Sequence, residues 1–148
     1  MLLKTASVVG LFGLDEYIKQ HVEENLEEGE SGKYLNDRIT LRKIYNRGFM
    51  FSSLEKKEGL VKAASIVAGL SLIRMDEKTN LLGNVGEKAG MTLIMAGAAS
   101  NVFDRIVRGK VIDYIPVAEN KKNHKQVTAN LGDFYIAIGG IIYAISRL

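Results

Sequence analysis

The segment GAASNVFDRIVRGKVIDYI, residues 97–115, passes from small uncharged residues into a dense group of polar ones. Gly97 and the small residues that follow it would let another backbone approach a helix closely. On that helix Gly97, Asn101 and Asp104 would share one face, because they are spaced by four and then three residues. Gly109 is predicted to end the helix, so the amide and the carboxylate fall near its end.

Two aspartates stand in apolar surroundings. Residues 111–115 predict a short strand that carries Asp113, and a carboxylate there costs free energy unless something uses it. Asp133 stands twenty positions further on, just inside another apolar helix. Two aspartates brought together from separate elements could activate a water molecule. The plainer alternative is that Asp113 faces solvent, and that Asp104 and Arg105 form an ion pair at a helix end.

Composition limits the other chemistries. The 148 residues predict one domain, and a content of 47% hydrophobic and 25% charged residues is that of an ordinary globular protein. There is no cysteine, and the two histidines lie far apart, so thiol chemistry is excluded and histidine-based metal sites are poorly supplied. We expect no metal and no cofactor. The net charge of +3 comes from polar loops without interleaved aromatic residues, which favours an anionic surface nearby over nucleic acid.

Four apolar segments alternate with polar ones. They cover roughly residues 2–18, 60–74, 88–105 and 130–147. None reaches the roughly 18 to 20 uninterrupted apolar residues of a membrane span, so a soluble helical bundle is an alternative. Three features favour the membrane: polar interruptions at the segment ends, frequent glycine and alanine inside, and the lack of a clear polar face.

The connections between these segments are predicted to be polar. Residues 39–45 alternate apolar and polar side chains, which predicts a strand. In the NRGFMF segment that follows, Asn46 and Gly48 suit a turn or bulge, and a plain hairpin explains them equally well. Residues 74–87 predict a short polar connection, and residues 116–126 predict a loop with a basic tract.

Two short-range pairs have local explanations. Asp15 and Lys19 are four residues apart, so they can pair on a helix, and from the residues alone a surface ion pair is favoured. Asn130 can cap the last helix with Asp133 at the third helical position, where the helix dipole favours a carboxylate. The same spacing is typical of a capping box with no catalytic role.

The order of these motifs resembles the signal peptidase II family, the lipoprotein signal peptidases, which are four-span aspartic peptidases of the bacterial inner membrane. LDEYIK, NRGFMF, ASNVFDR, VIDY and ANLGDF occur in the family's order over nearly the whole chain. The resemblance implies a mostly α-helical integral membrane protein. It would have four transmembrane helices and a small extracytoplasmic β-sheet between the first and second spans.

By this resemblance Asp113 and Asp133 are the catalytic pair of an aspartic endopeptidase that removes signal peptides from diacylglyceryl-modified prolipoproteins. The residues expected to bind substrate or support the site are Asn46, Gly48, Asn101, Asp104, Arg105, Asn130, Asp15 and Lys19. Ser100, Ala129 and Gly132 stand where members of the family usually carry glycine, phenylalanine and alanine. These small replacements leave the pair of aspartates intact.

The resemblance also implies partners and a location. The partners would be lipid-modified prolipoproteins and membrane lipids, and the protein would be a monomer in the bacterial cytoplasmic membrane with both termini cytoplasmic. Charge counting favours the reverse orientation, because most lysines and arginines lie in the segments that carry the motifs. We follow the resemblance, because several of these cations share a loop with acids and Arg105 belongs to the site motif. A catalytically weak membrane binding or assembly module is the alternative function.

Overall fold

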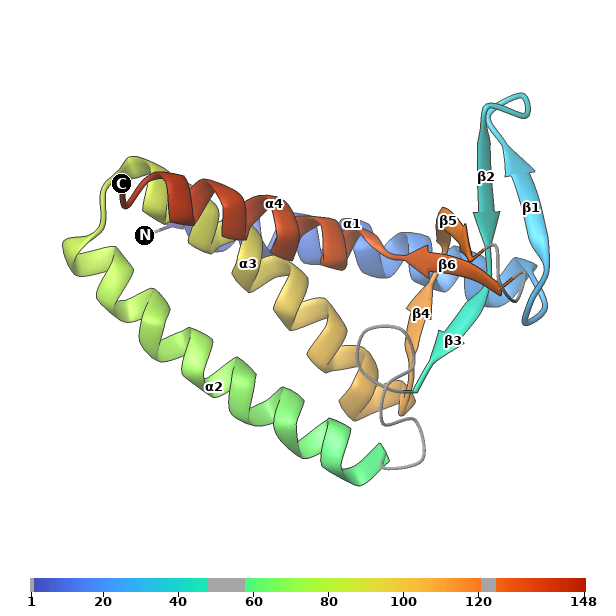
Figure 1. Cartoon of the computed structure of the whole chain (residues 1–148), viewed down its shortest axis with the longest axis horizontal. Helices are drawn as coiled ribbons and strands as arrows, with labels where there is room; N and C mark the ends of the chain where they lie inside the picture. Colours follow the sequence, from blue (N-terminus) through green and yellow to red (C-terminus); the bar gives the residue numbers. More distant parts are fainter. Residues whose placement is uncertain (1, 48–57, 121–124) are drawn as a thin grey trace.

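The computed structural model describes residues 2–47, 58–120 and 125–148. Helices form one end of the molecule and short strands gather at the other (Figure 1). The helices are α1 (Leu2–Asn25), α2 (Glu58–Leu82), α3 (Val85–Phe103) and α4 (Leu131–Ile145), and a π-helix, η3 (Asp104–Arg108), continues α3. Gly109 follows η3 with a φ of 73°, which confirms that this glycine ends the helix.

The strands pair two by two, and every pair is antiparallel. The pairs are β1 (Ser31–Tyr34) with β2 (Ile39–Arg42), β3 (Ile44–Asn46) with β4 (Val111–Asp113), and β5 (Ile115–Asn120) with β6 (Lys125–Ala129). The β3–β4 pair places Ile44 opposite Asp113. The prediction placed the β-sheet between the first and second helices. The structure differs, because only β1, β2 and β3 lie between α1 and α2 in the sequence, whereas β4, β5 and β6 lie between η3 and α4.

Two predicted connections were wrong. Residues 74–82 are helical and complete α2, because their polar side chains find partners: Lys4 of α1 forms an ion pair with Asp76. Lys4 also donates a hydrogen bond to the side chain of Asn80. Of residues 116–126, predicted as a loop, residues 116–120 lie in β5 and residues 125 and 126 lie in β6, and these two strands satisfy each other's backbone groups.

Small residues allow α3 and α4 to pack closely. A Cβ atom added to Gly97 would lie 2.1 Å from the carbonyl oxygen of Gly132. One added to Gly90 would lie 2.6 Å from the carbonyl oxygen of Gly139. The expected close backbone approach at Gly97 is therefore confirmed, and the partner is α4.

Many large apolar side chains of the helices are exposed, whereas several charged side chains are buried. Large apolar side chains that are more than half exposed include Leu2, Val9, Leu60, Val67, Ile141 and Ile145. Asp15, Lys19 and Asp104 are fully buried instead. Within the described ranges, no helix is at once long and apolar enough to cross a membrane.

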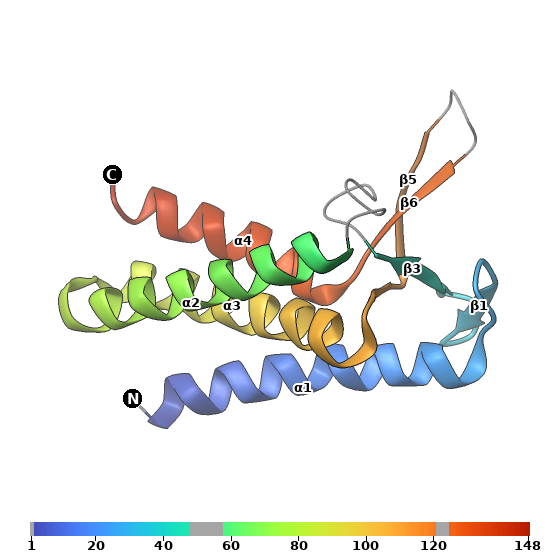
Figure 2. The same ribbon diagram turned by 90° about the horizontal axis from the view of Figure 1, so that it is seen from below.

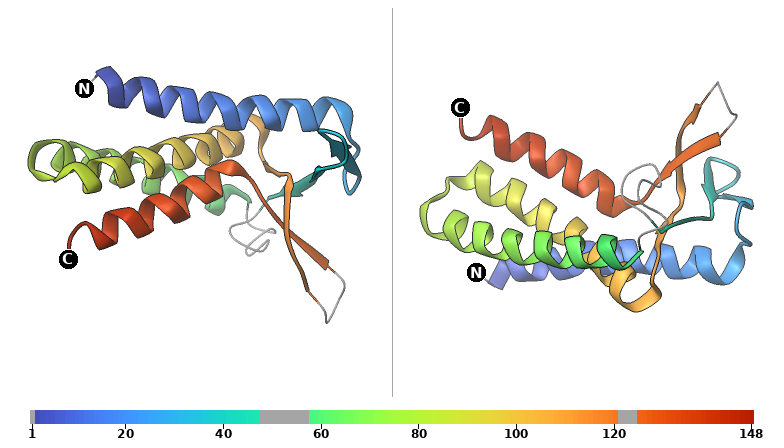
Figure 3. Two further views of the ribbon diagram at one scale, coloured as in Figure 1. Left: turned by 90° about the horizontal axis from the view of Figure 1, so that it is seen from above. Right: turned by 60° about the horizontal axis from the view of Figure 1, so that its bottom comes forward.

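The apolar core lies at the end that carries the strands. It is formed by Val22 of α1, Leu26 just after the end of α1, Ile112 and Tyr114. Figures 2 and 3 show both chain termini, and the turn between α2 and α3, at the opposite end of the helices. The chain therefore has a strand end, where the polar motifs collect, and a terminal end.

Candidate active site

Asp113 and Asp133 meet where β4 ends and α4 begins. Asn130 connects them, because it forms a hydrogen bond with each carboxylate. Its side-chain Nδ2 donates to Asp113 Oδ1 at 2.8 Å, and its backbone N–H donates to Asp133 Oδ2 at 3.2 Å. One asparagine thus holds two carboxylates from separate elements.

Each aspartate also accepts a hydrogen bond from an asparagine of a further element. Asn46 of β3 donates to Asp113 Oδ2 at 3.2 Å. Asn101 of α3 donates to Asp133 Oδ1 at 2.8 Å. All four carboxylate oxygens of the pair therefore have a donor, and four elements fix their positions.

The predicted helix cap at Asn130 is confirmed. The Oδ1 atom of Asn130 accepts the N–H of Asp133 at 2.9 Å, and the carboxylate of Asp133 accepts the N–H of Asn130, which completes a capping box. The side-chain oxygen of Asn130 therefore serves the helix, while its side-chain nitrogen is available to Asp113. The capping interpretation and the site interpretation are compatible.

Asp113 is only 4% exposed, so the alternative of a solvent-facing strand residue was wrong. Burial, and secondly the negative charge of Asp133, raise the pKa of Asp113 to about 7. The hydrogen bonds from Asn46 and Asn130 and the charge of Lys19 act in the opposite direction. At neutral pH the Asp113 carboxyl can therefore hold a proton, which an ordinary aspartate would not.

Arg105 brings a positive charge to the site. Its guanidinium donates to the backbone carbonyl of Asn101 at 3.1 Å and is attracted by the charges of Asp113 and Asp133. It also lines a pocket of about 210 Å³ whose other lining residues are Arg47, Gly59, Val61, Lys62 and Gly109. This cationic pocket therefore adjoins the pair of aspartates.

A cluster of buried charges lies between α1 and the end of α3. Lys19 Nζ is 2.9 Å from Asp15 Oδ2 and 2.9 Å from Asp104 Oδ2, and all three side chains are fully buried. The interpretation of Asp15 and Lys19 as a surface pair was therefore wrong. Arg108 forms an ion pair with Asp104 and another with Glu16, the latter at 2.6 Å. Asp104 is therefore paired with both Lys19 and Arg108, and not only with its sequence neighbour Arg105.

Two hydroxyl groups whose role sequence reasoning missed complete this cluster. The Ser100 hydroxyl donates to Asp15 Oδ2 at 2.6 Å and accepts from Lys19 Nζ at 2.6 Å. The Tyr114 hydroxyl donates to Asp15 Oδ1 at 2.7 Å. Only the adjacency of Tyr114 to Asp113 could have drawn attention to it in the sequence.

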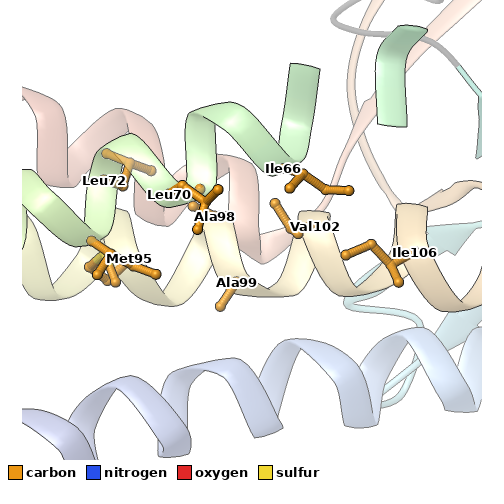
Figure 4. A pocket seen from close by; sticks show the side chains of 10 residues that line it. Ile66, Leu70, Leu72, Met95, Ala98, Ala99, Val102 and Ile106 are labelled. Carbon is orange, nitrogen blue, oxygen red and sulfur yellow. The ribbon is translucent and has the colours of Figure 1, made fainter. Parts of the chain in front are cut away.

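A separate pocket of about 240 Å³ lies between α2 and α3 (Figure 4). Its lining is entirely apolar and includes Ile66, Leu70, Met95, Ala98, Val102 and Ile106. Because it contains no titratable group, it takes no part in acid–base chemistry.

Gly48, predicted to belong to the site, lies outside the described residues. Within those residues no group of three or more acidic or histidine side chains could hold a metal ion.

Comparison with known proteins places the chain in a family. The family model described as Signal peptidase (SPase) II matches residues 7–148. The chain is 28% identical over 141 residues to the lipoprotein signal peptidase of Streptococcus pneumoniae, covering 95% of this chain and 89% of that protein. It is 33% identical over 147 residues to the lipoprotein signal peptidase of Mesorhizobium japonicum, covering 95% and 82%.

The fold is also found among solved structures. A solved structure described as a bacterial membrane enzyme superposes with a TM-score of 0.81 at 20% identity, covering 99% of this chain and 88% of that chain. At that identity the superposition shows a shared fold, whereas the family model covers nearly the whole sequence. The chain belongs to the signal peptidase II family.

Proposed function

We propose that this protein is a membrane aspartic endopeptidase that removes signal peptides from diacylglyceryl-modified prolipoproteins. The observation that carries the proposal is the hydrogen-bonded group of Asp113, Asn130 and Asp133, in a chain of the signal peptidase II family. Two carboxylates in a poorly solvated site cannot both ionise without a large cost. One then holds a proton while the other acts as a base, which is the arrangement that water activation needs.

The reaction follows from these two states. The carboxylate of Asp133 takes a proton from a water molecule, and the water oxygen bonds to the carbonyl carbon of the scissile peptide. The Asp113 carboxyl gives its proton to the leaving nitrogen, the carbon–nitrogen bond breaks, and a new carboxyl group and a new amine form. Asp113 is then ionised, and Asp133 holds the proton that came from water. In such a coupled pair the acid and base roles belong to the pair and alternate between steps.

We propose a single membrane-embedded peptidase domain over residues 1–148, with the four helices as spans. Support comes from the distribution of side chains, because many large apolar residues of the helices are exposed, whereas Asp15 and Lys19 of α1 are buried and paired. A buried ion pair reduces the cost of placing Asp15 and Lys19 at membrane depth. The partners would be lipid-modified prolipoproteins and membrane lipids, and the active unit would be a monomer in the bacterial cytoplasmic membrane.

A cleavage assay tests the proposed activity. The purified protein in detergent is incubated with a diacylglyceryl-modified prolipoprotein, and the shorter product is measured by mass spectrometry. The same precursor without the lipid is the control, and it should remain uncleaved. A folded protein that yields no product from the lipidated precursor would favour the alternative, a membrane binding or assembly module.

The pH dependence of cleavage should show an alkaline limb near pH 7. The pKa of Asp113 is raised to about 7, so raising the pH through that value removes the proton that the carboxyl must donate. We expect kcat/KM to decline above this pH and to be retained just below it. Rates measured between pH 5.5 and 9, with the stability of the protein checked at each end, provide the test. A constant rate up to pH 9 would exclude Asp113 as the acid.

The orientation can be tested with introduced cysteines, since the chain contains none. Ser31 of β1 and Lys78 near the end of α2 are exposed. β1 and the turn between α2 and α3 lie at opposite ends of the molecule (Figure 1). With a membrane-impermeant thiol reagent on intact cells, we expect labelling of the Ser31→Cys variant and none of the Lys78→Cys variant. Broken cells should label both. The reverse pattern on intact cells would support the orientation that charge counting favours.

A further inference from the structure

The Tyr114 hydroxyl joins three elements at one point. It donates to Asp15 Oδ1 at 2.7 Å and accepts the backbone N–H of Leu131 at 3.2 Å. The N–H of Leu131 also lies 3.2 Å from Asp15 Oδ1, so the three groups close a triangle. This triangle connects the residue after β4, the middle of α1 and the first residue of α4.

Both aspartates of the proposed site stand next to this triangle. Tyr114 follows Asp113 directly, and Leu131 is two residues before Asp133. Any change in the distance between Tyr114 and Leu131 is therefore transmitted to the two carboxylates over one or two residues of backbone. The Tyr114 backbone is held as well, because its N–H donates to the carbonyl of Ala129 at 2.9 Å.

Asp15 is a fixed point for this arrangement. Its other oxygen, Oδ2, lies 2.9 Å from Lys19 Nζ and accepts the Ser100 hydroxyl at 2.6 Å. The Asp15 and Lys19 side chains are fully buried, so water does not compete for these contacts. Contacts from α1 and α3 therefore fix the Asp15 carboxylate, and the carboxylate in turn fixes the position of the Tyr114 hydroxyl.

We infer that Tyr114 is a positioning residue, whose hydroxyl, bound to Asp15, sets the separation of Asp113 and Asp133. The inference rests on the proposed function. The Tyr114 ring has a different task, because it packs against Val22, Leu26 and Ile112 in the apolar core. Replacement by phenylalanine separates the two roles, since it removes the hydroxyl and keeps the ring.

The separation of the two aspartates has a measurable electrostatic consequence. Besides burial, the charge of Asp133 on α4 raises the pKa of Asp113, and the charge of Lys19 on α1 lowers it. Arg105 on η3 is a further charged group at this site, and the charges of both aspartates act on it. If the aspartates move apart, the effect of Asp133 weakens while burial persists, so the pKa of Asp113 should fall toward its ordinary value.

The test compares Tyr114→Phe with the unchanged protein in the prolipoprotein assay. We expect kcat to fall by roughly 10- to 100-fold, because displacement of a catalytic group by about 1 Å has effects of this size. KM should change by less than about twofold, because no substrate contact is removed. The alkaline limb should move to lower pH. The control is Tyr143→Phe, which removes a hydroxyl 3.4 Å from Thr79 Oγ1 at the other end of α4 and should leave all three values unchanged.

A second measurement needs no turnover. The ¹³C chemical shift of the Asp113 carboxyl, assigned by its loss in Asp113→Asn, is followed against pH in the unchanged protein and in Tyr114→Phe. A lower midpoint in the variant supports the inference, and identical midpoints overturn it. If the unchanged protein does not cleave the substrate, the proposed function fails and this titration alone decides the inference.

A third variant covers failure of Tyr114→Phe to fold. Ser100→Gly removes the hydroxyl that holds Oδ2 of Asp15, and it should shift the Asp113 midpoint in the same direction by a smaller amount. An unchanged midpoint in Ser100→Gly, with Tyr114→Phe unfolded, would overturn the role of Asp15 as the fixed point. Wild-type kcat and an unchanged pH profile in Tyr114→Phe would overturn the inference directly.

Discussion

Asp113→Asn and Asp133→Asn should each lower kcat for prolipoprotein cleavage by about 10⁴-fold, since loss of one member of a catalytic group typically has this effect. An amide keeps the shape of the carboxyl group but cannot exchange its proton. The amide oxygen keeps one of the two hydrogen bonds that each carboxylate accepts, and the amide nitrogen cannot accept the other. KM should change far less than kcat, because the side chain keeps its size and shape. Single-turnover cleavage of the lipidated precursor by each purified variant measures the effect. Full activity in either variant would remove that residue from the mechanism.

The stability of Asp113→Asn should move in the opposite direction to its activity. The pKa of Asp113 is raised to about 7 in the folded protein, whereas an unfolded aspartate titrates at about 3.9. Folding is therefore favoured most below the unfolded pKa, and stability is lost as the pH rises through the folded pKa. At pH 8 the amide has no proton to lose, so the variant should melt at an equal or higher temperature. A variant that loses activity because it unfolds would melt lower.

The capping role of Asp133 requires its own control, and the chain supplies one. α3 begins with the same capping box, in which Asn84 Oδ1 accepts the N–H of Glu87 at 2.9 Å and Glu87 Oε2 accepts the N–H of Asn84 at 2.8 Å. Glu87→Gln should cost about 0.3–1 kcal/mol of stability, as the loss of a charge at a helix N-terminus does. Cleavage should remain complete. Equal loss of activity in Glu87→Gln and Asp133→Asn would show that only the cap matters.

Features that depend on neighbours in the sequence were predictable. The spacing of Gly97, Asn101 and Asp104 predicted one helix face, and Gly97 and Asn101 both meet α4 in the structure. Asp104, in η3, instead meets Lys19 of α1. The Asn130 cap followed from residue type and position, and it is present. In each case the helical period or a local hydrogen bond determines the result, so the pattern is visible within a few residues.

Features that depend on distant partners were not predictable in the same way. The polar residues that complete α2 are helical although their partner, Lys4, lies 72 residues from Asp76. The Tyr114 hydroxyl binds Asp15 across 99 residues of sequence. Burial of Lys19 likewise requires Asp104, which no local pattern pairs with it. Such contacts arise from tertiary packing, and the sequence shows only that the groups exist.

Lys19→Met should lower the free energy of unfolding by about 3–5 kcal/mol, which is the usual cost of removing one partner from a buried ion pair. The ammonium group lies 2.9 Å from carboxylate oxygens of both Asp15 and Asp104, and all three side chains are fully buried. Methionine has a similar length and packs well, so the main loss is the charge. Denaturant unfolding in detergent measures the change. It is monitored by circular dichroism, because the chain has no tryptophan for fluorescence.

Two further variants separate the lost charge from lost packing. Lys62→Met removes an exposed lysine that donates to the carbonyl of Ile106 at 3.0 Å, and it should cost less than about 1 kcal/mol. Adding Asp15→Asn to Lys19→Met should restore part of the stability, because it removes one of the carboxylates left without its partner. The amide oxygen can still accept from Tyr114, and the amide nitrogen can donate to the Ser100 hydroxyl. If Lys19→Met and Lys62→Met lower the free energy of unfolding by the same amount, the buried ion pairs of Lys19 do not stabilise the fold. If the double variant is no more stable than Lys19→Met, its cost comes from packing rather than charge.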